Sequence, residues 1–131
     1  MGSEPAMISH HCGILLISPG HERAHYALML ATAAAALGRP VTIFATNGGC
    51  RLMLAAAPLE RDAREVVLAR AGVATIATLM EAARALNIRR IACEAGLRAE
   101  ALEAEPLAKG VEAAGLVTFL GAVGVGQVIS L

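Results

Sequence analysis

The sequence has few aromatic residues and no excess of basic charge. Its 131 residues include two phenylalanines, one tyrosine and no tryptophan, and its 11 basic residues are balanced by 11 acidic ones. No basic cluster is larger than the pair Arg89 and Arg90. A nucleic-acid-binding surface normally needs a basic patch, often with stacking aromatic side chains, so nucleic acid is not expected as a partner.

Cysteine is also scarce and irregularly placed. The chain has three cysteines, none of them in a C-x-x-C motif. An odd, unpatterned set with no recognisable secretory leader argues against a disulfide framework and against thioredoxin-like dithiol chemistry. The expected location is therefore a reducing compartment, with the cytoplasm as the default.

Common nucleotide-binding and phosphatase motifs are missing. There is no Gly-x-x-x-x-Gly-Lys phosphate loop, and Gly124-Val-Gly126 is not followed by a predicted helix as a dinucleotide site requires. Cys93 and Arg98 have a C-x4-R spacing, which differs from the loop of the cysteine-dependent phosphatases. No cofactor is expected.

One long uncharged stretch, Ala113 to Leu131, needs separate treatment because its 19 residues are close to the length that spans a bilayer. Four glycines and Gln127 interrupt it, and it divides into a short helix and a terminal strand. We therefore expect no membrane span.

What the chain does contain is aliphatic: 56% of its residues are hydrophobic. Apolar runs predict strands, and helical spacing with glycine or asparagine stops predicts helices between them. The stretch from Cys50 is the least regular, with a short helix predicted at 50–57 and a charged segment at 59–71 left unassigned. Strands are expected at 13–18, 41–46, 88–93, 111–114 and 127–131, and helices at 21–37, 78–86, 98–103 and 116–123.

This alternation predicts parallel pairing through right-handed crossovers. We expect a three-layer α/β/α sandwich with a five-stranded parallel sheet in the order 2-1-3-4-5. Residues 1–12 are predicted to be a flexible N-terminal arm and residues 13–131 a single domain.

The predicted strand order ranks the three cysteines. With strands one and three adjacent, the Ser18-Pro19-Gly20-His21 loop faces Cys93 at the end of strand three, where ligands bind in doubly wound sheets. Cys50 follows strand two, two strands from Cys93 and about 10 Å away, so a role as resolving thiol requires a movable loop. Cys12 precedes strand one, at the opposite edge of the sheet.

Cys93 is therefore the best candidate for a reactive residue. A cysteine between a strand and the following helix N-terminus is near free backbone amides, which favour the thiolate. Glu94 opposes this effect, while Arg98 or His21 supports it. The alternative is that Cys93 is a small buried apolar residue, a common role for free cysteine.

The histidines suggest a second, weaker hypothesis. His21 and His25 lie one helical turn apart and could bind a metal such as zinc, with Cys93 or Glu94 as third ligand. A pair that only caps or decorates the start of a helix is favoured, so no metal site is expected. The same holds for His10 and His11 on the predicted arm.

Four segments together resemble a known family: Gly13 to Ser18, Val41-Thr-Ile-Phe-Ala-Thr46, Ile88-Arg-Arg-Ile-Ala-Cys-Glu-Ala-Gly-Leu-Arg98, and Gly110-Val-Glu-Ala-Ala-Gly-Leu-Val-Thr-Phe-Leu120. From Gly13 onward the chain is similar to the DsrE/DsrF-like family. The region from Cys50 to Ala71 departs most from the family pattern. The Pro-x-x-x-Thr-x-x-Cys context of true peroxiredoxins is absent, which disfavours peroxide reduction.

The resemblance implies a sulfurtransferase or sulfur carrier that holds a persulfide on the cysteine after the third strand, here Cys93. It also implies sulfur-donor and sulfur-acceptor proteins as partners and assembly as a homotrimer or homohexamer. The alternative function is a non-catalytic oligomeric module that binds a small ligand or partner, with Cys93 structural. The pocket around Cys93 is expected to include Ser18, Gly20, His21, Asn47, Glu94 and Arg98.

Overall fold

Five parallel strands form one sheet in the computed structural model, which describes residues 10–131. Residues 1–9 of the predicted arm lie outside the described residues. All four strand pairings are parallel, as predicted. The strands are β1 (Cys12–Leu16), β2 (Val41–Ala45), β3 (Arg89–Cys93), β4 (Val111–Ala114) and β5 (Gln127–Ser130).

The strand order is β4-β3-β2-β1-β5, so the predicted order 2-1-3-4-5 was wrong. The chain adds β2, β3 and β4 successively on one side of β1 and then returns to place β5 on the other side. Burial explains this arrangement, since all five residues of β2 are buried, as a central strand requires, whereas β4 and β5 are partly exposed. The direction of the crossovers therefore reverses between β1 and β5, not between β1 and β3.

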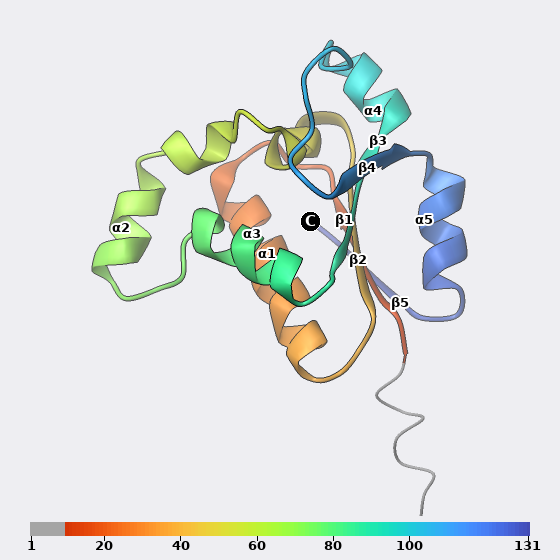
Figure 1. The fold of residues 1–131 in the computed structure, drawn as a ribbon, viewed down its shortest axis with the longest axis horizontal. Helices are drawn as coiled ribbons and strands as arrows, with labels where there is room; N and C mark the ends of the chain where they lie inside the picture. The colour runs from red at the N-terminus through yellow and green to blue at the C-terminus, as the bar shows by residue number, and fades with distance from the viewer. Residues whose placement is uncertain (1–9) are drawn as a thin grey trace, which may run out of the picture.

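Helices cover both faces of the sheet, which gives the predicted three layers (Figure 1). The helices α1 (His21–Ala36) and α3 (Ile76–Ala85) pack against each other on one face, and α5 (Leu116–Val123) lies on the other. Right-handed crossovers explain this division, because the connections from β1 to β3 advance in one direction and the connection to β5 runs back. The short helix α2 (Arg64–Arg70) lies at the periphery of the α1 and α3 layer.

Two segments differ from the predicted helices. The chain after β2 forms two 3₁₀ turns, η2 (Asn47–Met53) and η3 (Pro58–Arg61), instead of an α-helix at 50–57. The helix expected at 98–103 is α4 (Glu94–Ala99), which begins directly after β3. Tight packing explains η2, since a Cβ at Gly49 would overlap the carbonyl oxygen of Leu16.

The core divides into two apolar clusters separated by the sheet. The larger one fills the space between the sheet and the α1 and α3 layer. The smaller one lies under α5, where the rings of Phe44 and Phe119 stack with centroids 5.0 Å apart. Ile91, Cys93 and Val123 complete it. Cys93 thus points to the face of the sheet that α5 covers.

The uncharged stretch from Ala113 divides into the end of β4, then α5 and β5. Within residues 10–131, no helix has both the length and the apolar character needed to cross a membrane.

Candidate functional site

Cys93 lies at the junction of β3 and α4. It is the last residue of the strand and the N-cap of the helix, and its Sγ accepts a hydrogen bond from the backbone N–H of Gly96 at 3.3 Å. An amide donor at the start of a helix stabilises negative charge on the sulfur. The residue is 7% exposed. The geometry therefore places the sulfur against a helix N-terminal amide, beneath a largely closed surface.

Cys50 lies much closer to Cys93 than predicted. Because β2 and β3 are neighbours, η2 begins beside the end of β3, and the prediction of an intervening strand was wrong. Burial raises the pKa of the Cys50 thiol to about 11, and the nearby Cys93 adds to the rise, which the Cys93 backbone N–H only partly offsets. The Cys50 Sγ donates to the carbonyl of Ala45 at 3.5 Å. At neutral pH, Cys50 is a protonated thiol next to Cys93.

Close packing and one ion pair hold the segments that carry these two thiols. A Cβ at Gly96 would overlap the backbone nitrogen of Asn47, so α4 can approach η2 only because that position is glycine. Nη1 of Arg51 lies 2.7 Å from Oε1 of Glu100, which joins η2 to the end of α4. Asn47, a predicted pocket residue, is thereby placed at the edge of the Cys93 site.

The other predicted pocket residues are spread along the same edge of the sheet. Glu94 and Arg98 are exposed on α4, and Gly20 is the exposed N-cap of α1. Ser18 lines a cleft of about 450 Å³ between the ends of β1 and β5, together with Arg23 and Ser130. This cleft lies where the crossover direction reverses, which is where ligands bind in open α/β sheets.

His21 makes its contact with α2. Its Nε2 lies 2.7 Å from Oε2 of Glu65, and both side chains are buried. Glu65 also accepts hydrogen bonds from the backbone N–H groups of Ile76 and Ala77, at 2.9 Å and 3.2 Å. Burial acts to raise the pKa of Glu65, but these three hydrogen bonds outweigh it and hold the pKa below the ordinary value. Glu65 therefore joins the first turns of α1 and α3 as a carboxylate.

The two histidines suggested as metal ligands are bonded to other groups. Nε2 of His25 lies 2.8 Å from the carbonyl of Ala74, and its ring stacks on His21 with centroids 6.0 Å apart. Over the described part of the chain, no three His, Cys, Asp or Glu side chains are grouped so that they could hold a metal ion.

Sequence reasoning missed two buried charged residues, Glu65 and Arg90. No local sequence pattern indicates that Glu65 is buried, because its hydrogen-bond partners belong to α1 and α3. Arg90 could have been found, since adjacent strand residues point to opposite faces, so one residue of the Arg89–Arg90 pair has to point toward the face that two packed helices cover. Arg90 is 4% exposed, while Arg89 pairs with Glu112 at 2.9 Å on the other face.

The fold and site define a class of small, doubly wound α/β proteins with a thiol at the junction of an inner strand and its helix. Residues 12–131 match the DsrE/DsrF-like family, and the chain belongs to that family. No curated protein matches the chain.

Two solved structures have the same fold. The ychN protein from E. coli superposes with a TM-score of 0.70 at 16% identity, over 93% of this chain and 99% of that chain. A protein of unknown function, MTH1491 from Methanobacterium thermoautotrophicum, superposes with a TM-score of 0.57 at 13% identity, over 94% and 100% of the two chains. Both similarities concern the fold.

Proposed function

We propose that this protein is a sulfur carrier that holds a persulfide on Cys93 and exchanges it with donor and acceptor proteins. The observation that carries the proposal is the position of Cys93 at the N-cap of α4, with its Sγ on the Gly96 amide. Membership of the DsrE/DsrF-like family, which is linked to sulfur relay, supports the same role.

The chemistry is a thiol–persulfide exchange with no net oxidation. The Cys93 thiolate attacks the outer sulfur of a donor persulfide, so that a bond forms between Sγ and that sulfur while the donor S–S bond breaks. The electron pair leaves on the donor thiolate. An acceptor thiolate then attacks the outer sulfur held by Cys93, which restores the Cys93 thiolate. The Gly96 amide stabilises Sγ whenever it carries negative charge.

The state of Cys50 supports a carrier that keeps its sulfur. A Cys50 thiolate attacking Sγ of the Cys93 persulfide would form a Cys50–Cys93 disulfide and release hydrosulfide, which ends the relay. Only the thiolate attacks, and the pKa of about 11 keeps Cys50 protonated at neutral pH. Cys50 is thus a neighbour that does not discharge the persulfide.

The burial of Cys93 favours a second candidate. At 7% exposure, and within the apolar cluster under α5, Cys93 is also suited to be a structural residue in a module that binds a small ligand or a partner. The two candidates differ in one measurable property, the reaction of Cys93 with a persulfide donor.

Mass spectrometry after exposure to glutathione persulfide tests the choice. The carrier predicts the added mass of one sulfur atom on the Cys93 peptide of the folded protein. The adduct disappears in Cys93→Ser and is retained in Cys12→Ser, the matched control at the other edge of the sheet. A folded protein whose Cys93 gains no sulfur contradicts the carrier and favours the binding module.

The same proposal places the protein in the cytoplasm, as a homotrimer or homohexamer. Cys12, Cys50 and Cys93 are all free, which suits a reducing compartment. Leu116, Val117 and Leu120 are 50%, 84% and 53% exposed on α5, and such an apolar surface suits contact with a second copy.

A further inference from the structure

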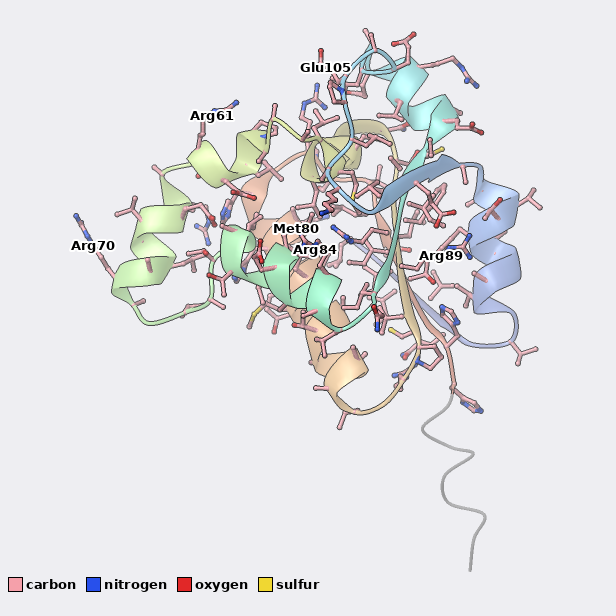
Figure 2. The ribbon with its side chains drawn as sticks, viewed as in Figure 1. Arg61, Arg70, Met80, Arg84, Arg89 and Glu105 are labelled. Carbon is pink, nitrogen blue, oxygen red and sulfur yellow. The ribbon has the colours of Figure 1, made fainter. Side chains whose placement is uncertain are left out.

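A second cleft lies on the face of the sheet opposite the Cys93 side chain. It has a volume of about 390 Å³ and is formed by η2, η3, α3 and the connection into β4. Figure 2 shows Met80 and Arg84 along α3, which borders this cleft, and Arg89 across the sheet beside α5. The cleft is therefore separate from the proposed persulfide site.

The floor of the cleft holds a buried arginine with incomplete hydrogen bonding. Arg90 is 4% exposed, and its Nη2 donates to the carbonyl of Lys109 at 3.1 Å, while its buried Nε has no partner. Among residues 10–131, no carboxylate lies within ion-pair distance of its guanidinium. Burying a cation raises the free energy of the folded protein unless an anion pairs with it. The Arg90 guanidinium is buried without such an anion in the described part of the chain.

The backbone leaves room for Arg90 by means of a glycine. Gly110 has φ +87°, and a Cβ there would come within 2.7 Å of Nη2 of Arg90. Only glycine adopts this φ readily, so the turn before β4 requires glycine, and the missing side chain leaves space for the guanidinium.

The charges around Arg90 are unequal. Arg84 and Lys109 also line the cleft, whereas Glu60 and Glu81 are its acidic residues. Three basic and two acidic side chains leave a net charge of +1. Burial, together with repulsion from Glu65 and Glu81, raises the pKa of Glu60, so the carboxylates of the cleft already repel one another.

Apolar side chains supply the remaining surface of the cleft. Leu52, Leu54 and Met80 line it beside the charged groups. A ligand that fits must therefore combine one anionic group with an aliphatic part, and the crowded carboxylates disfavour a second anionic group.

We propose that this cleft binds a small organic monoanion, whose carboxylate pairs with the Arg90 guanidinium and whose aliphatic part contacts Leu54 and Met80. A guanidinium donates two parallel hydrogen bonds to a carboxylate, and Arg90 lines the cleft without an ion-pair partner among the described residues. This site is independent of Cys93 and of the proposed persulfide chemistry.

An NMR titration of the full chain with hexanoate tests the site, with inorganic phosphate as a probe that lacks the aliphatic part. Hexanoate should shift the backbone amide signals of Leu54, Met80 and Gly110 and bind more tightly than phosphate. Arg90→Met should weaken hexanoate binding by at least about tenfold, since a charge-assisted pair is lost. Arg70→Gln, which removes an exposed arginine on α2, should change it by less than about twofold. Shifts outside the cleft, or equal weakening by both variants, overturn the proposal.

Two surface substitutions provide a second test that does not depend on replacing a buried residue. Glu81→Gln removes negative charge from the cleft and should strengthen hexanoate binding about two- to threefold, while Lys109→Gln should weaken it by a similar factor. Opposite signs support the site. Equal effects, or effects of the same sign, contradict it.

Discussion

Glu65 is the buried residue of α2, and it connects three helices through one carboxylate. Replacing it with alanine leaves His21 and two backbone N–H groups without their acceptor. We expect Glu65→Ala to lower the free energy of unfolding by about 2–4 kcal/mol, as for other broken buried pairs. Urea denaturation followed by circular dichroism measures this change.

Glu60→Ala is the matched control, because Glu60 is an exposed carboxylate five residues away on η3. Partial burial of its carboxyl, together with Glu65 and Glu81, raises its pKa, so its removal relieves repulsion and should change stability by less than about 0.5 kcal/mol. Equal losses in the two variants would contradict the role given to Glu65.

The lowered pKa of Glu65 also predicts how stability depends on pH. A carboxyl whose folded pKa lies below its unfolded value of 4.5 contributes stability above that value. The contribution is lost as the pH falls below 4.5 and through the folded pKa. We expect Glu65→Gln to remove this part of the acid-induced loss, so that the unfolding curves of the two proteins converge toward low pH. Parallel curves between pH 6 and pH 3 would be inconsistent with this linkage.

The helix α5 is held against the sheet by a small group of apolar side chains. Phe119 stacks on Phe44, and Val123 lies over Gly13, where a Cβ would overlap its methyl group and come within 3.0 Å of the Phe119 ring. Cys93 belongs to the same cluster, so the packing of α5 against the sheet also determines how far solvent can reach Cys93.

Two glycine-to-alanine substitutions should therefore have opposite effects. Gly13→Ala forces α5 away from β1 and should cost about 1–3 kcal/mol, as overpacked cores do. Gly121→Ala lies inside α5 with open space around the new methyl group, and should stabilise the protein by about 0.5–1 kcal/mol through helix propensity. Thermal and urea unfolding measure both changes, and the same sign in both would disprove this account of α5.

The two faces of the sheet are covered unequally. Two packed helices bury one face, while the short helix α5 covers the other and leaves its own outer side apolar and exposed. Surfaces of this kind commonly mark an interface between protein chains.

If α5 forms the contact in the proposed homotrimer or homohexamer, a charge at the most exposed of its large apolar residues should disrupt assembly. We expect Val117→Glu to reduce the molar mass measured by light scattering to that of a smaller species or a monomer. Leu37→Glu, at an exposed apolar position after α1, is the control and should leave the mass unchanged. A wild-type monomer refutes the assembly, and an unchanged mass in Val117→Glu assigns the interface to another surface.

Much of this architecture follows from local sequence. The apolar run at β2 and the bounds of β4 and α5 were predicted because side-chain periodicity and glycine stops act over a few residues. The position of Cys93 at the end of a strand is local in the same sense. The 3₁₀ turns of η2 were not predicted, because they depend on the close packing of Gly49 against β1.

The alternation of strands and helices, the parallel sheet and the junction that holds Cys93 thus follow from local patterns along the chain. The order of the strands depends instead on contacts between distant segments. The right-handed rule gives the hand of each crossover, but it does not say on which side of the previous strand the next one is added. That order brought Cys50 beside Cys93. It likewise placed Glu65 on His21 and buried Arg90 without an anion, since the partners of a buried charge are supplied by other elements of the fold.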